Sequence, residues 1–212
     1  MNKDVVCLLY DLFADLLAYP TPDLLHQTQA CIDHLGPIHP EAATVIEKFS
    51  RAIKQRALEQ IEELYTTTFD MQPVCYPYIG YHLFGESYKR GAFMAQLNEA
   101  YHAFGYSAEQ ELPDHLSVAF RFLGLDSANR QGDFCQALLH EGIIPALEKM
   151  RQAFGESENP YASLLTVLHL VLDPTGFAKY SPIKVASNPV QPAHPDSPET
   201  CHVFSEKEFD HA

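Results

Sequence analysis

The sequence has few basic residues compared with its acidic ones, and this shortage excludes several classes of partner. Lysine and arginine number 14 against 28 aspartate and glutamate residues, so the formal net charge is -14. Such a chain repels the phosphates of nucleic acids and anionic membrane surfaces. We therefore expect no nucleic-acid partner. The acidity indicates either a basic partner or a surface that keeps the protein in solution.

Closely spaced cysteines and long apolar runs are also missing. The five cysteines are odd in number and widely spaced, so they predict neither a disulfide framework nor a zinc module. The apolar stretch from Val5 to Tyr10 is short and is followed by Asp11 and Asp15, unlike a signal peptide or a membrane span. We expect a cytoplasmic protein with reduced thiols and no direct membrane insertion.

The motifs of common enzyme sites are absent as well. The chain contains no G-x-S-x-G, no phosphate-binding glycine loop and no H-E-x-x-H. The sequence therefore offers no motif for an enzyme active site or a metal site, and it predicts a protein that is not an enzyme. One alternative stays open: His82 and Glu86 stand four residues apart, and with His115 they could serve a small helical metal-dependent enzyme. The cysteine and histidines near the C-terminus, Cys201, His202 and His211, are interpreted as part of a polar end.

Apolar residues recur at helical spacing through most of the chain. The pattern predicts helices over residues 5–19, 24–35, 42–53, 57–69, 79–84, 87–104, 114–124, 129–140, 143–154 and 160–172, and a loop over 70–77. Ser87 is expected to cap its helix and Glu86 to pair with Arg90, while Asp114 suits an N-cap. No segment alternates apolar and polar residues as a half-buried strand does. The sequence predicts an all-α fold.

The composition changes after Leu172. Six prolines fall between residues 174 and 198, few large apolar residues accompany them, and the end is acidic. Such a segment buries too little apolar surface to offset its loss of conformational entropy. We expect a single-domain helical bundle over 1–180 and a flexible, Pro-rich tail over 181–212.

Four short motifs follow one another in the chain. They are Leu16-Leu17-Ala18-Tyr19-Pro20, the run from Tyr65 to Phe69-Asp70, the run from His82-Leu83 through Gly85-Glu86-Ser87 to Arg90-Gly91, and Glu111-Leu112-Pro113-Asp114-His115-Leu116. At these residues the chain resembles the NarJ branch of the TorD-like redox-enzyme maturation chaperones. The resemblance covers about residues 5–172, with all four motifs in the expected order.

The resemblance implies an all-helical chaperone that binds the N-terminal segment of a molybdenum-enzyme catalytic subunit, by default one like nitrate reductase. Clients in this family typically carry twin-arginine signal peptides or vestiges of them. The chaperone holds the apoprotein until the molybdenum cofactor is inserted and the partner subunits assemble, and it carries no cofactor itself. It is expected to be a monomer or a homodimer. A general helical adaptor with many partners is the remaining alternative.

The residue types at these motifs also suit a peptide groove. A client with apolar and basic residues needs aromatic walls with carboxylates at the rim. Aromatic residues cluster in and just after the loop over 70–77, namely Tyr76, Tyr78, Tyr81, Phe84 and Tyr88, although each of them alone could equally belong to the core. The predicted client-binding residues are Phe69, Asp70, Tyr81, His82, Phe84, Glu86, Arg90, Glu111, Pro113, Asp114 and His115.

Overall fold

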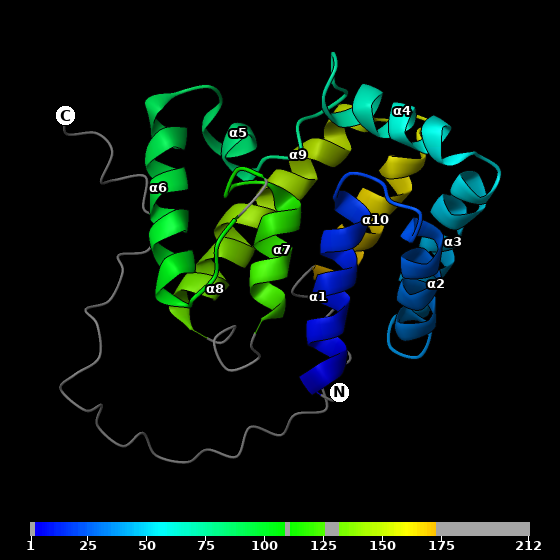
Figure 1. The fold of residues 1–212 in the computed structure, drawn as a ribbon, viewed down its shortest axis with the longest axis horizontal. Helices are drawn as coiled ribbons and strands as arrows, with labels where there is room; N and C mark the ends of the chain where they lie inside the picture. The colour runs from blue at the N-terminus through cyan, green and yellow to red at the C-terminus, as the bar shows by residue number, and fades with distance from the viewer. Residues whose placement is uncertain (1–2, 109–110, 126–131, 173–212) are drawn as a thin grey trace.

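The computed structural model describes residues 3–108, 111–125 and 132–172, and its regular elements are all helices (Figure 1). They are α1 (Lys3–Leu17), α2 (Leu24–Leu35), α3 (Pro40–Lys54), α4 (Leu58–Phe69), α5 (Ile79–Phe84), α6 (Tyr88–Ala103), α7 (Leu116–Gly124), α8 (Asp133–Ala137), the π-helical η2 (Leu138–Ile143), α9 (Ile144–Phe154) and α10 (Pro160–Leu172). The all-α prediction is confirmed. The predicted tail over 181–212 and the domain boundary at 180 lie outside the described residues.

The helices pack around one continuous core. α1 lies against α7 and α2, α3 lies between α2 and α10, and α10 packs on α9 (Figure 1). The short helix α5 rests on α9, α6 and η2. The largest side chains sealed inside are aromatic and come from helices along the whole chain: Phe13, Phe49, Phe93, Tyr101, Phe120 and Tyr161. Their burial ties the two ends of the described chain into one body.

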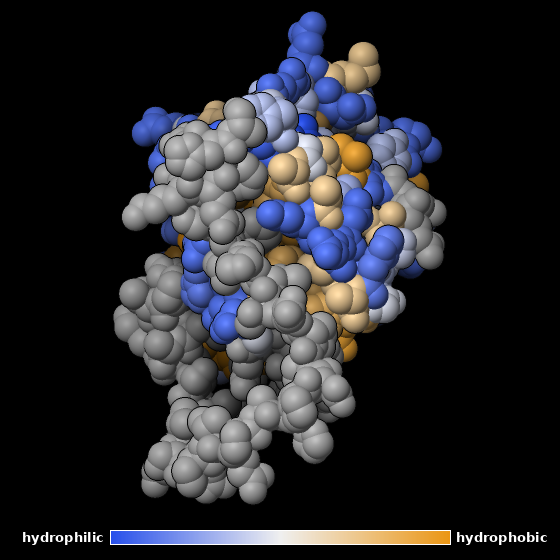
Figure 2. Space-filling model, turned by 90° about the vertical axis from the view of Figure 1, so that its left-hand side faces the viewer, coloured by the Kyte–Doolittle hydropathy of each residue, from blue (hydrophilic) through white to orange (hydrophobic). Residues whose placement is uncertain are grey.

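Helix α6 lies at one side of the molecule and turns only part of its surface inward (Figure 1). Phe93, Leu97 and Tyr101 face the core, and the Tyr101 ring packs against Phe122 of α7 at 4.6 Å between centroids. On the outer side, hydrophobic and hydrophilic side chains are interspersed over the described surface (Figure 2). This helix also supplies Arg90, so its packing on the core positions that side chain.

The segment from Asp133 to Phe154 differs from the prediction, which expected two separate helices. α8, η2 and α9 follow one another without a break. Pro145 has no N–H to donate to a preceding carbonyl, and a π-helical turn accommodates such a missing bond. A Cβ at Gly142 would stand 3.4 Å from Leu138 Cδ1 and 3.5 Å from Ile79 Cγ2, which are ordinary contact distances, so α5 packs beside this position without requiring a glycine there. The glycine does not end the helix.

The predicted contacts at the start of α6 were partly wrong. Ser87 is the N-cap residue, but its hydroxyl donates to the Phe84 carbonyl oxygen at 3.0 Å instead of capping the helix. Arg90 pairs with Asp114 and not with Glu86. Asp114 does not cap α7, because the N-cap residue is His115. Only the Arg90–Asp114 pair replaces a local contact with one between residues distant in the sequence.

Candidate functional site

A pocket of about 230 Å³ opens between the C-terminal end of α4, the loop over 70–78 and the loop before α7. Ten residues line it: Tyr19, Tyr65, Thr66, Phe69, Asp70, Tyr76, Pro77, Tyr78, Glu111 and His115. Five of them are aromatic side chains and two are carboxylates. The pocket therefore combines apolar walls with negative charge.

The pocket brings together motifs that are far apart in the sequence. Tyr19 comes from the first motif, Tyr65, Phe69 and Asp70 from the second, and Glu111 with His115 from the fourth. Packing of α1 against α7 carries the first motif to the fourth. Asp15 strengthens this contact, since its carboxylate accepts hydrogen bonds from Arg121 at 2.8 Å and from Gln27 at 3.1 Å. Tertiary packing thus brings residues of three short motifs together in one pocket.

Ring contacts hold the tyrosine walls in place. Tyr65 packs on Phe69 at 5.1 Å and on Tyr19 at 5.5 Å between ring centroids, and its hydroxyl donates to the Leu17 carbonyl oxygen at 3.1 Å. On the opposite wall, Tyr76 packs against Tyr81 at 4.3 Å. Tyr65 is buried, whereas Tyr19 is 52% exposed. The walls are rigid at the bottom and open at the rim.

The charge of Asp70 acts on Glu111, and both carboxylates act on the tyrosines. Burial raises the pKa of Glu111, the charge of Asp70 raises it further, and hydrogen bonds from Leu112 and Tyr78 oppose the shift. Burial is also the main cause of the raised pKa of Tyr65, and both carboxylates add to it. Two negative charges therefore act on one small, partly dehydrated space.

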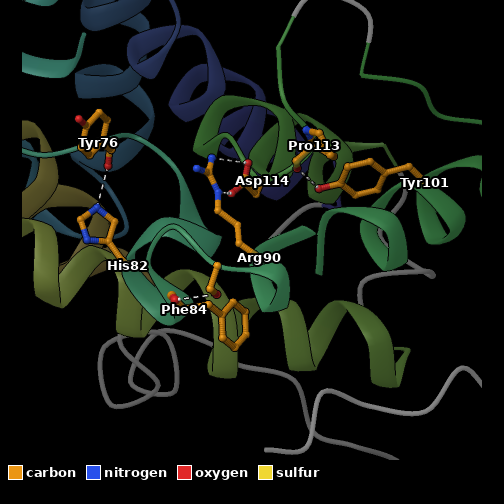
Figure 3. A network of polar contacts seen from close by, with 8 residues as sticks. Tyr76, His82, Phe84, Arg90, Tyr101, Pro113 and Asp114 are labelled. Carbon is orange, nitrogen blue, oxygen red and sulfur yellow. Dashed lines mark hydrogen bonds and ion pairs between the residues drawn. The ribbon is translucent and has the colours of Figure 1, made fainter. Parts of the chain in front are cut away.

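Behind the pocket, Arg90 and Asp114 form an ion pair with two hydrogen bonds (Figure 3). Arg90 Nε donates to Asp114 Oδ2 at 2.8 Å, and the second bond, from Nη2 to Oδ1, measures 3.3 Å. The Asp114 carboxylate is fully buried, while the Arg90 side chain is 16% exposed. Because the carboxylate has no contact with solvent, Asp114 does not face the pocket as a rim acid. This finding corrects its predicted place in the groove.

The loop before α7 is bonded at several consecutive residues. Tyr101 donates its hydroxyl hydrogen bond to the Pro113 carbonyl at 3.0 Å (Figure 3). The Asp114 carbonyl accepts from Ile79 N at 2.8 Å, and Leu116 N donates to the Pro77 carbonyl at 2.9 Å. These bonds form an isolated antiparallel bridge between Tyr78 and His115. The bridge sets the position of Tyr78, whose ring also lies 5.0 Å from the Arg90 guanidinium carbon.

His115 is a buried, neutral hydrogen-bond acceptor. Its Nδ1 accepts from the Ser117 backbone N at 3.1 Å and lies 2.6 Å from the Ser117 hydroxyl oxygen. A backbone amide can only donate, so Nδ1 carries no proton and the imidazole is neutral. Burial lowers the pKa of His115 to about 4. Burial thus keeps the imidazole neutral.

The remaining predicted residues lie on α5 and the turn after it. The His82 Nε2–H donates to the Tyr76 carbonyl at 2.7 Å, Phe84 packs on Phe93 at 5.5 Å, and Glu86 is exposed. Burial lowers the pKa of His82. Within the described ranges, no three His, Cys, Asp or Glu side chains gather as a metal site would need. His82 Nε2 and His115 Nδ1 both take part in internal hydrogen bonds.

The structure thus divides the predicted site residues into three groups. Phe69, Asp70, Glu111 and His115 line the pocket, Arg90, Pro113 and Asp114 lie behind it, and Tyr81, His82, Phe84 and Glu86 belong to α5 and its following turn. Six lining residues were not among the predicted ones, namely Tyr19, Tyr65, Thr66, Tyr76, Pro77 and Tyr78. Tyr19 and Tyr65 are defined positions of the motifs, Thr66 lies at an unspecified position of the second motif, and aromatic clustering indicates Tyr76 and Tyr78. Neither pattern points to Thr66 or Pro77.

A second hollow of about 530 Å³ lies over α3 and α4, lined by Gln55, Arg56, Gln60, Glu63, Leu64 and Thr67. It has no aromatic wall, and it contains both an arginine and a glutamate. Ligand sites are mostly apolar concavities with a few placed polar groups. The smaller, tyrosine-walled pocket fits this description better, although it has less volume.

No helix among the described residues combines the length and apolar character needed to cross a bilayer. The family model described as nitrate reductase delta subunit matches residues 36–166, which is more than half of the chain. No curated protein matches the sequence. A crystal structure of a candidate redox enzyme maturation protein from Archaeoglobus fulgidus is similar, with a TM-score of 0.51 and 23% identity, over 80% of this chain and 92% of that one. This structural likeness supports the fold.

Proposed function

Because the chain belongs to the nitrate reductase delta subunit family, we propose that it binds the N-terminal segment of a molybdenum-enzyme catalytic subunit and holds that subunit for cofactor insertion and assembly. The family is one of redox-enzyme maturation chaperones and not of enzymes, so membership implies a redox enzyme as the partner. The finer parts of the proposal are the N-terminal segment, the molybdenum cofactor and the location of the binding site.

The observation that carries the proposal is the meeting of three motifs at one tyrosine-walled pocket. Residues that support folding alone would be expected in the sealed core, whereas this pocket is open and holds two carboxylates. Peptide segments bind in grooves where side-chain pockets give specificity. The pocket is smaller than the roughly 300–1,000 Å³ of small-molecule sites, so it accommodates one or two side chains of a longer segment.

Exposed apolar residues adjoin the pocket in the chain. Met71 follows Asp70 and is 70% exposed, Leu112 follows Glu111 and is 44% exposed, and Val74 lies in the same loop as Met71. Large apolar side chains exposed together mark interaction sites more often than isolated ones do. They supply apolar surface next to the pocket for the rest of a client segment.

A peptide panel tests the proposal. Labelled peptides of about 30 residues, one for each molybdenum-enzyme catalytic subunit encoded in the same genome and long enough to span a signal segment, are titrated with the full chain by fluorescence anisotropy. One client peptide is expected to bind at least about tenfold more tightly than the others, because system-specific chaperones discriminate by differences in affinity. Equal affinity for all peptides, or binding of none, would contradict the proposal.

Two neighbouring threonines of α4 provide a matched pair of variants. Thr66 lines the pocket, while Thr67 is exposed and lines the second hollow. Thr66→Phe fills the pocket and is expected to weaken client binding by at least about tenfold, as loss of a central contact does. Thr67→Phe places the same ring on the same helix and is expected to leave binding unchanged. Equal effects of the two variants would show that the client binds elsewhere.

A further inference from the structure

The lining of the pocket has negative charges without a positive one. Asp70 and Glu111 are both exposed at its rim, and among the lining residues the structure describes there is no lysine or arginine. His115 is the only basic side chain of the lining, and its internal hydrogen bonds keep it neutral. A pocket of this kind has an uncompensated negative potential.

Arg90 lies close to the pocket lining, against the ring of Tyr78, but it is already engaged. Its guanidinium lies over the outer wall residue Tyr78, but both of its hydrogen bonds described here go to the buried carboxylate of Asp114. Moving it into the pocket would leave the Asp114 carboxylate unpaired in the interior, which is strongly unfavourable. The chain therefore keeps this cation behind the wall.

The aromatic walls favour a flat cation in particular. Tyrosine ring faces carry partial negative charge and attract cations that lie within about 6 Å of the ring centre. The rings of Tyr19 and Tyr65 meet edge to face at 73°, so the two walls present differently oriented surfaces to the same space. A planar guanidinium can stack on one ring while its N–H groups point at carboxylates, whereas an ammonium has no plane to stack.

We propose that the pocket takes the guanidinium of one arginine of the client segment, bonded to Asp70 and Glu111 and stacked on the tyrosine walls. This inference rests on the proposed function and names the chemical group that the pocket selects. The cation also relieves the repulsion between the two carboxylates, neither of which forms an ion pair with a lysine or arginine among the described residues. The apolar part of the segment then extends over the surface around Met71 and Leu112.

A small probe separates this pocket chemistry from the rest of the client. N-acetyl-arginine amide is titrated into isotope-labelled full-length protein, and the signals of the pocket residues are followed by NMR. Saturable shifts at Tyr78 and Glu111 are expected, with at least about threefold weaker binding of the lysine analogue because it cannot stack or bond in a fork. The citrulline analogue has the same shape and no charge, and it is expected to cause no saturable shift. Citrulline binding as tight as arginine, or lysine binding as tight as arginine, would overturn the proposal.

Carboxylate variants test the location. Asp70→Asn and Glu111→Gln are each expected to weaken binding of the arginine probe by about fivefold, as loss of one charge-assisted hydrogen bond does. Glu63→Gln removes a carboxylate from the same helix as Phe69, in the second hollow, and is expected to change nothing. Unchanged binding in both pocket variants would refute the assignment.

The two proposals fail in different ways. If a client peptide from the panel binds tightly and its arginine-to-citrulline versions bind equally well, the guanidinium assignment is wrong and the chaperone function stands. If the arginine probe binds in the pocket but no client peptide binds, the pocket chemistry is correct and the proposed client is wrong.

Discussion

Asp114 and Glu111 stand close together in one motif, yet they lie in different environments. Asp114 is fully buried and bonded to Arg90, whereas Glu111 is exposed at the rim of the pocket and has no ion pair among the described residues. One carboxylate holds the loop in place, and the other faces whatever enters the pocket. Residues that share a motif therefore need not share a role. Whether a motif residue supports the fold or faces a ligand depends on its burial and on the side chain that it pairs with.

The largest expected effect concerns the supporting pair. Asp114→Ala leaves the Arg90 guanidinium unpaired in a mostly buried place, and we expect the free energy of unfolding to fall by about 3–5 kcal/mol. Urea denaturation measures this change. The double variant with Arg90→Ala should lose less than the sum of the single variants, since the two side chains interact directly. Glu111→Gln, in the same motif, is expected to change stability by less than about 0.5 kcal/mol. Equal losses for Asp114 and Glu111 would remove the distinction between the two regions.

The next effect is the pH dependence of stability that His115 introduces. Its pKa is about 4 in the folded protein against the ordinary value of 6.5, so the unfolded chain binds the proton more readily. The contribution of His115 to the free energy of unfolding is fully present above pH 6.5 and declines as the pH falls toward 4. Between pH 7 and pH 5 the loss is about 2 kcal/mol. His82, whose pKa is also lowered, acts in the same direction. Denaturation curves at several pH values measure the slope.

A matched variant isolates the contribution of His115. His115→Asn keeps a side-chain acceptor at the N-cap but does not titrate, so its stability should fall less as the pH is lowered. An unchanged slope in this variant would show that the imidazole is not the group responsible.

The smallest expected effects compare two glycines near the Arg90 pair. A Cβ at Gly80 would lie 2.8 Å from Asp114 Oδ2 and 3.0 Å from Phe93 Cδ1, so Gly80→Ala is expected to destabilise by about 1–2 kcal/mol. A Cβ at Gly91, one residue after Arg90, meets nothing within 4 Å. Gly91→Ala should stabilise the protein by about 0.5–1 kcal/mol, because alanine favours a helix. Thermal unfolding distinguishes the signs. A stabilising Gly80→Ala would mean that the supporting region is loosely packed.

Local signals predicted the elements of the fold well. Prolines and glycines separate the expected helices, and the bounds of α2, α5 and α10 agree with the predicted ranges. The clearest error occurs where a tertiary contact replaced a local one. Arg90 was expected to pair with Glu86, four residues before it, but reached a buried carboxylate that offers two bonds in a less polar place. Gly142 was expected to lie between two helices and instead lies inside the continuous helical segment from α8 to α9.

The sequence predicted which motifs belong to the candidate site, but it did not predict how their residues are arranged in space. The resemblance placed Asp70, Glu111 and His115 near a client, and the structure brings these three to one pocket. The resemblance did not distinguish the role of Asp114 from that of Glu111, because the residue type of a carboxylate does not show whether it is buried. Thr66 and Pro77 enter the lining only because α4 and the loop over 70–77 fold beside α7. Their residue types alone suggest nothing of the kind.

The sequence by itself determined that this chain is helical, acidic and a member of a maturation family, because helix periodicity, net charge and short motifs depend on residue type and order alone. The tertiary structure decided which motif residues are buried and which remain open. Burial and pairing depend on packing between segments that are distant in the chain, such as α1 against α7 and Arg90 against Asp114. That packing buries Asp114 against Arg90, where it supports the loop, and leaves Asp70 and Glu111 open in the pocket.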